Sequence, residues 1–73
     1  MTAMNDLLPI TVNGESRQVS AGTSVADLLQ TLDTAGRRLA VERNGEIVPR
    51  SRHGETPLAA GDQVEIVIAV GGG

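Results

Sequence analysis

The residues of this chain that could take part in chemistry are three consecutive glycines, Gly71, Gly72 and Gly73. Three glycines in a row contribute nothing to packing, so we expect a thin and mobile tail that can enter a narrow channel. Without a Cβ on Gly72 or Gly73, the terminal carbonyl carbon is unhindered. An enzyme that activates or attacks the carboxylate of Gly73 would therefore meet no steric resistance, and Gly71 and Gly72 would give it access. Glycine tails also occur as frayed ends or expression scars, and that alternative stays open.

The glycines directly follow the strongest strand pattern in the chain, which alternates over residues 64–68. A tail that continues a strand is attached directly to the rigid folded domain, whereas residues left over from protein expression more often follow a polar linker. Val67 and Ala69 lie on the strand face that should point away from the core. Together with Val70 they are the candidate partner-binding surface beside the tail. Strand propensity alone explains Val67 and Ala69 about as well.

The composition limits both the fold and the class of function. With 73 residues the chain forms one small domain, which disfavours an enzyme with a deep pocket. The absence of cysteine and aromatic residues excludes disulfides, zinc–thiolate sites and base-stacking platforms. A net charge of −3 with scattered arginines argues against nucleic-acid or anionic-membrane partners. The longest apolar run is too short to span a membrane and no signal peptide is visible, so we expect a cytoplasmic protein.

Two Asn-Gly pairs, Asn13-Gly14 and Asn44-Gly45, each stand between apolar segments and predict hairpins with tight primed turns. Pro9 lacks a backbone donor, which places it near a strand start or at a sheet edge. We expect residues 51–60 to form an irregular crossover, anchored by Leu58, before the last strand.

Between the two hairpins lies one predicted helix. Its apolar residues recur at helical spacing: Val25, Leu28, Leu29 and Leu32. Ser24 can cap the first turn, with Asp27 in the capping-box position. Gly36 is the expected end of the helix. Arg37 and Arg38 then follow at the negative end of the helix dipole, which explains them better than a phosphate-binding role.

An amphipathic helix must bury its apolar stripe, and the sheet is the available partner. We therefore predict an α+β fold, one helix on a mixed sheet of four or five strands, with the last strand central and parallel to the first. Residues 1–7 form a flexible lead-in, residues 8–70 the domain and residues 71–73 the tail. The predicted core consists of Ile10, Val12, Leu28, Leu29, Leu32, Val41, Val64 and Ile66.

The single histidine, His53, lies in the polar crossover beside Arg52 and Glu55. One histidine with nearby carboxylates offers too few ligands for a metal, so we expect an exposed, solvated side chain and no metal site. No set of nucleophile, base and orienting group is visible elsewhere, and no segment has the pattern of a phosphate-binding loop. The chain itself therefore should bind no cofactor.

The order and spacing of several segments resemble the ThiS family of sulfur carriers, which has the ubiquitin-like β-grasp fold. The matching segments are residues 12–14, 23–29, 41–50, 61–67 and 70–73. The chain departs from the family at Arg52-His53, where members often carry an aromatic residue. The related small subunit of molybdopterin synthase shares the fold and the tail, but Ile68-Ala69-Val70 does not match its sequence before the glycines.

The resemblance implies that an E1-like, ThiF-type adenylyltransferase uses ATP to convert the Gly73 carboxylate to an acyl-adenylate. Sulfur then displaces AMP, and the thiocarboxylate supplies sulfur to a ThiG-type thiazole synthase in thiamine biosynthesis. A carboxylate is a poor electrophile, so it must be masked by a good leaving group before sulfur can attack. The alternatives are a carrier for molybdopterin or cysteine synthesis, a ubiquitin-like modifier of lysines, and a non-covalent interaction module.

Overall fold

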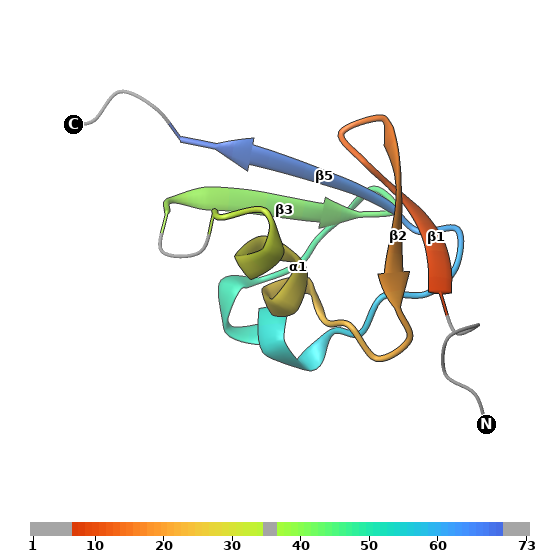
Figure 1. Cartoon of the computed structure of the whole chain (residues 1–73). Coiled ribbons are helices and arrows are strands. Elements are labelled where there is room, and N and C mark those ends of the chain that lie inside the picture. The colour runs from red at the N-terminus through yellow and green to blue at the C-terminus, as the bar shows by residue number, and fades with distance from the viewer. Residues whose placement is uncertain (1–6, 35–36, 70–73) are drawn as a thin grey trace.

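The structure is a computed structural model that describes residues 7–34 and 37–69. Five strands form one mixed sheet in the order β2-β1-β5-β3-β4, and α1 lies against one face of it (Figure 1). The last strand, β5, is central and parallel to β1, as predicted, and it is antiparallel to β3. The elements in chain order are β1 (Leu7–Val12), β2 (Glu15–Ser20), α1 (Val25–Thr31), β3 (Leu39–Arg43), β4 (Glu46–Ile47), the 3₁₀ helix η2 (Arg50–Glu55) and β5 (Gln63–Ile68).

Both predicted hairpin turns are confirmed. Asn13 and Gly14 have φ of 51° and 84°, and Asn44 and Gly45 have φ of 54° and 87°. Positive φ at both central residues defines the primed turn that matches the twist of the flanking strands, and asparagine and glycine accept it at low cost. Pro9 lies near the start of β1, before the ladder with β5 begins at Thr11. Its missing donor therefore interrupts no bond of that ladder.

The helix begins where the sequence predicts and ends earlier. Ser24 accepts from the backbone N–H of Asp27, and the Asp27 carboxylate accepts from the N–H of Ser24, both at 3.1 Å. The expected end at Gly36 is wrong, because Asp33 has φ of 61° and closes the helix after Thr31. The N–H groups of Asp33 and Thr34 donate to the carbonyls of Gln30 and Leu29, a Schellman arrangement with aspartate in place of glycine.

The core lies between α1 and the sheet and is wholly aliphatic. Seven of the eight predicted residues are buried, whereas Leu32 at the end of the helix is partly buried and packs against the others. Val25, Val48 and Leu58 complete the buried cluster. Leu58 therefore anchors the crossover as predicted, although the crossover contains the 3₁₀ helix η2 rather than irregular chain throughout. No helix in residues 7–34 and 37–69 is long and apolar enough to cross a membrane.

Candidate functional site

The expected reactive residue, Gly73, lies outside the described residues, as do Gly71, Gly72 and Val70. The described chain ends at Ala69, directly after β5. Here the backbone N–H of Ala69 donates to the carbonyl of Arg38 at 2.8 Å. Pairing between β5 and β3 therefore continues up to the last described residue, and a strand held by the sheet leads toward residues 70–73 (Figure 1).

Two of the predicted partner-binding residues lie on the expected face of this strand. Val67 is 65% exposed and pairs with Ala40 of β3, and Ala69 is also exposed. Val64 and Ile66 alternate with them and are buried beneath α1. Side chains on one strand alternate between faces, so Val67 and Ala69 point away from the helix. Their placement is confirmed, and their contact with a partner stays a prediction.

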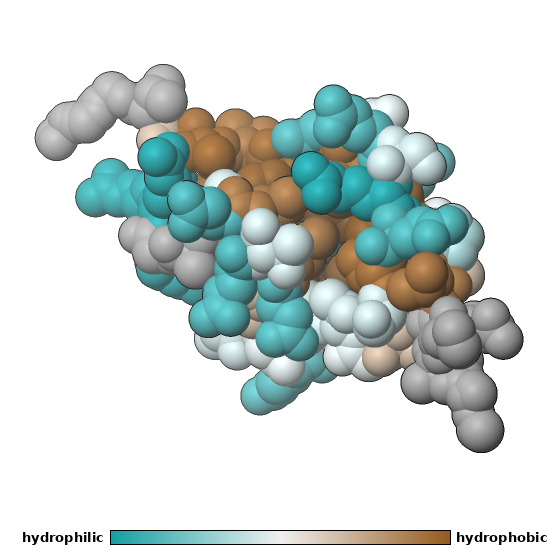
Figure 2. Space-filling view, in the orientation of Figure 1, coloured by the Kyte–Doolittle hydropathy of each residue, from teal (hydrophilic) through white to brown (hydrophobic). Residues whose placement is uncertain are grey.

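The helix side of β5 is also incompletely covered near its end. Because α1 ends at Thr31, Leu32 and Ile68 are only partly buried. They line a groove with Val12 and Ile66. Figure 2 shows hydrophobic surface between the C-terminal end of the described chain and the N-terminal hairpin. Apolar side chains are thus accessible on both faces of β5 just before the tail, a location suited to contact with another protein.

Two turn asparagines hold β5 from opposite sides. The side chain of Asn13 accepts from the N–H of Ile66 at 2.8 Å and donates to its carbonyl at 3.3 Å. The side chain of Asn44 accepts from the N–H of Gln63 at 2.9 Å, and the backbone N–H of Asn44 donates to the carbonyl of Gln63 at 2.8 Å. Each asparagine therefore both forms a hairpin turn and extends the hydrogen bonding of β5. The sequence predicted the turns and not these contacts.

Asp62, just before β5, is a buried ionised hub that sequence reasoning missed. Its carboxylate accepts from the backbone N–H of Ala59 at 2.8 Å, from Arg43 Nε at 2.7 Å and from Asn44 Nδ2 at 3.0 Å. Burial of the carboxyl group opposes its ionisation, but the hydrogen bonds from Ala59, Arg43 and Asn44 outweigh burial and hold the pKa of Asp62 below its usual value. The start of β5 is therefore fixed by a charge-assisted network.

The expectation that His53 is exposed and solvated is wrong. Its exposure is 8%, and its Nε2 lies 3.1 Å from the carbonyl oxygen of Val48. That geometry fits donation from Nε2 to the carbonyl, which satisfies the buried ring. Arg52 is exposed on η2. In residues 7–34 and 37–69, no three His, Cys, Asp or Glu residues are grouped to hold a metal ion.

Hydrogen bonds from both neighbouring hairpins thus hold β5 in the sheet up to the last described residue. The two fixed points, at Asn13 and at Asn44 with Asp62, lie on either side of β5. A strand fixed in this way can carry a short segment into the active site of another protein at a defined position.

The ThiS family model matches residues 10–73. A sulfur carrier protein ThiS of Escherichia coli is 32% identical over 66 residues, which cover 90% of this chain and 100% of that protein. The crystal structure of a thiamine biosynthesis protein, ThiS, of Geobacter metallireducens superposes with a TM-score of 0.76. It is 35% identical, and the match covers 90% of this chain and 100% of that one.

Longer proteins also match. A protein of Paramagnetospirillum magneticum named thiazole synthase is 44% identical over 66 residues, and one of Magnetococcus marinus with the same name is 41% identical over 66 residues. The match covers 90% of this chain and 20% of each relative, so the chain spans about a fifth of their length. These relatives therefore contain a carrier-like stretch within a larger protein.

Proposed function

The chain belongs to the ThiS family of sulfur carriers, and we propose that its sulfur is carried on the carboxylate of Gly73. It is a carrier protein of thiamine biosynthesis with the ubiquitin-like β-grasp fold, and not an enzyme. Gly71 and Gly72 serve as the unhindered approach to the reacting carbonyl, since neither carries a Cβ. We also propose a cytoplasmic location, where ATP for the activation step is available.

The proposed chemistry has two steps. A carboxylate oxygen of Gly73 attacks the α-phosphorus of ATP, which forms the acyl-adenylate and releases pyrophosphate. A sulfur nucleophile at the oxidation level of sulfide then forms the C–S bond as the C–O bond to AMP breaks. The product is a thiocarboxylate, itself a sulfur nucleophile. Adenylation is needed because a free carboxylate repels nucleophiles and has no good leaving group.

The observation that carries the proposal is the way β5 is held immediately before the glycines. Its pairing with β3 reaches the Ala69 N–H to Arg38 carbonyl bond, and side chains fix it at two points, Asn44 at Gln63 and Asn13 at Ile66. A tail anchored to such a strand loses less freedom on entering an active site than one attached to a loose linker. The fold therefore favours delivery of residues 70–73 to a partner.

Two partners follow from the proposed chemistry. A ThiF-type adenylyltransferase supplies the ATP site and catalyses the activation, because no segment of the sequence has the pattern of a phosphate-binding loop. A ThiG-type thiazole synthase receives the sulfur, which the carrier-like stretch within relatives named thiazole synthase supports. Val67, Ala69 and Val70 are the proposed contact residues beside the tail, since the first two are exposed and apolar.

Intact mass spectrometry tests the proposal. The chain, purified without any C-terminal extension, is incubated with a ThiF-type enzyme, ATP and a sulfide-level sulfur source. Replacement of one oxygen by sulfur increases the mass by about 16 Da, and fragmentation should place that change at Gly73. ATP–pyrophosphate exchange measures the first step alone. An unmodified mass despite carrier-dependent exchange would contradict the sulfur step, and a modification placed elsewhere would contradict the assignment of Gly73.

A further inference from the structure

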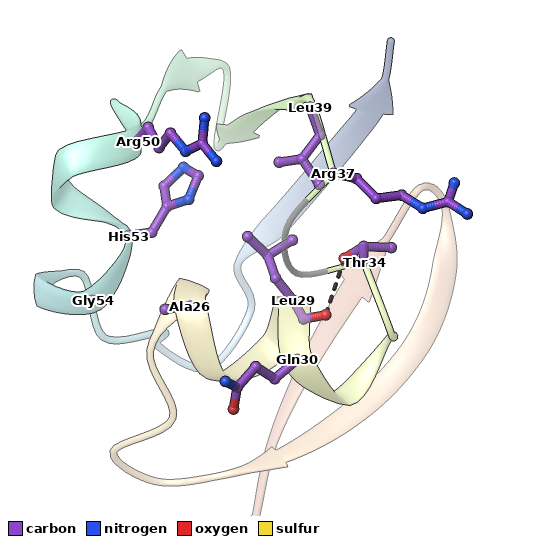
Figure 3. A pocket seen from close by; sticks show the side chains of 9 residues that line it. All are labelled: Ala26, Leu29, Gln30, Thr34, Arg37, Leu39, Arg50, His53 and Gly54. Carbon is purple, nitrogen blue, oxygen red and sulfur yellow. Dashed lines mark hydrogen bonds between the residues drawn. The ribbon is translucent and has the colours of Figure 1, made fainter. Parts of the chain in front are cut away.

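A cavity of about 280 Å³ lies between α1, the beginning of β3 and η2. Ala26 and Leu29 of α1 and Leu39 of β3 give it apolar walls, and Arg37, Arg50 and His53 add polar groups. Figure 3 shows the Arg50 guanidinium and the His53 ring on one side of this pocket, with Leu39 and Leu29 across from them. The pocket therefore combines an apolar lining with cationic groups at its rim.

The arginines here lack the role that the sequence suggested. With the helix closed by Asp33, Arg37 and Arg38 are not in its last turn and do not complement its dipole. Four of the six arginines of the chain belong to the segments around the pocket: Arg37, Arg38, Arg50 and Arg52. Within residues 7–34 and 37–69 the ion pair found is Arg43 with Asp62, so none of these four is neutralised there. A chain of net charge −3 thus has a local concentration of positive charge.

We propose that this pocket binds an acidic, apolar segment of the adenylyltransferase that activates the tail, which rests on the proposed function. An apolar side chain of that segment packs on Leu29 and Leu39, and a neighbouring carboxylate pairs with Arg50. Arg37, on the other rim, provides a second guanidinium within the same site. Apolar contact shields the ion pair from water, and a guanidinium can hold a carboxylate through two hydrogen bonds.

The location of the pocket favours the enzyme that receives the tail as its occupant. Leu39, which lines the pocket, pairs with Ile68 of β5, and the backbone carbonyl of the neighbouring Arg38 accepts from the N–H of Ala69. The pocket thus begins beside the strand end from which residues 70–73 continue. One protein that binds the tail can therefore reach the pocket. Two linked contacts on one partner strengthen each other, because the second forms at a high effective concentration.

A small anion alone fits the pocket less well. Arg37 and Arg50 are both exposed, and an ion pair between exposed groups contributes about 0–1 kcal/mol. A free phosphate or carboxylate would leave the apolar walls of Leu29 and Leu39 uncovered. A protein segment covers both parts of the site at once, and the charge of the rim specifies that the segment is acidic.

The test compares charge and shape variants in ATP–pyrophosphate exchange and in direct binding to the adenylyltransferase without ATP. Arg50→Glu should raise both KM for the carrier and Kd by about 10-fold with kcat unchanged, because docking is lost and the tail is intact. Ala26→Leu fills the pocket without changing charge and should weaken binding about 5-fold. The double variant Gln18→Glu/Ser20→Glu changes the net charge by the same amount at exposed positions of β2, away from this pocket and from the groove beside β5. It is the matched control and should change Kd less than about 2-fold.

Equal losses for Gln18→Glu/Ser20→Glu and Arg50→Glu would mean a general charge effect and would overturn the proposal, as would an unchanged Kd for both pocket variants. Unfolding midpoints verify that all three variants are folded. An NMR titration of the wild-type chain with inorganic phosphate and with acetate distinguishes a site for a small anion from a site for a protein segment. Saturable binding of either anion with a Kd below about 1 mM would overturn the proposal. Binding is measured without the reaction, so failure of exchange in the wild-type chain would count against the proposed function and leave the binding comparison intact.

Discussion

The two ends of β5 are held in different ways. At its start, β5 has neighbours on both sides, β1 and β3, and the side chains of Asn44 and Asp62 add hydrogen bonds there, while Asn13 bonds Ile66 farther along the strand. At its end, pairing continues with β3 alone among the described strands, through Leu39 with Ile68 and the bond from Ala69. The start has a buried charge and satisfied polar groups, whereas the end has exposed apolar side chains.

This difference separates stability from function along one strand. Hydrogen bonds and buried charge at the start fix the position of the strand, so substitutions there should lower the free energy of unfolding. The end contributes less to the fold and leads to the glycines, so substitutions there should weaken reactions with partner enzymes and leave the stability nearly unchanged. The following predictions test that separation, beginning with the largest expected effect.

Deletion of Gly73 should lower ATP–pyrophosphate exchange by about 100-fold or more, because the carboxylate is withdrawn by one residue from the α-phosphate. Gly72→Val should have a similar effect, since a β-branched side chain hinders entry of the tail. Thermal unfolding should be unchanged in both variants, and exchange is followed with a ThiF-type enzyme. Full exchange by the truncated chain would show that the terminal glycine is not the reacting group.

Leu28→Ala should lower the free energy of unfolding by about 2–5 kcal/mol, because Leu28 is 1% exposed and truncation leaves a cavity beneath the helix. Urea denaturation measures this change. Val67→Ala, at a 65% exposed position on the opposite face, is the control and should leave the urea midpoint nearly unchanged. Similar losses for the two variants would mean that the sheet faces are assigned wrongly.

The sequence predicts those parts of the fold that short-range signals determine. The two Asn-Gly turns and the capping box of Ser24 and Asp27 are local patterns with a single geometric solution. The end of the helix was missed because two signals compete, and Asp33 takes the left-handed conformation before Gly36 is reached. An aspartate in that conformation is uncommon, so the sequence favoured the glycine.

The missed parts of the site depend on contacts between residues far apart in the chain. Asp62 accepts hydrogen bonds from Arg43 and Asn44, which are 19 and 18 positions away, and no local sequence pattern predicts that network. His53 is buried because η2 brings it to the carbonyl of Val48. The polar residues around His53 in the sequence had instead favoured an exposed side chain. The outward face of Val67 was predictable because alternation in a strand is local.

Asp62→Asn should lower the free energy of unfolding at pH 7 by about 1–3 kcal/mol, since the network loses its charge. Solvent limits the contribution of the ion pair to this loss, because Arg43 is one-third exposed and partly screened. The lowered pKa of Asp62 means that its stabilisation is complete above the unfolded-state value of about 3.9. It is lost as the pH falls through the folded-state pKa. Urea midpoints of wild type and variant should therefore converge as the pH falls below the unfolded-state pKa and through the folded-state pKa.

Glu65→Gln is the matched control for charge, because Glu65 is an exposed carboxylate on the same strand. Its urea midpoint at pH 7 should not fall. A constant difference between wild type and Asp62→Asn over the whole acid range would show that the charge of Asp62 does not stabilise the start of β5.

Asn13→Gly should have the smallest effect, a loss of about 1 kcal/mol, because glycine accepts the positive φ of 51° and only the side-chain bonds to Ile66 disappear. Hydrogen exchange can locate the loss: the amide of Ile66 should exchange about 5-fold faster. Asn44→Gly is the matched variant, since it has the same turn geometry and releases the amide of Gln63 instead. If each variant accelerates its own amide and spares the other, the two asparagines act as separate local clamps. Equal acceleration of both amides in both variants would instead mean that β5 opens as one unit.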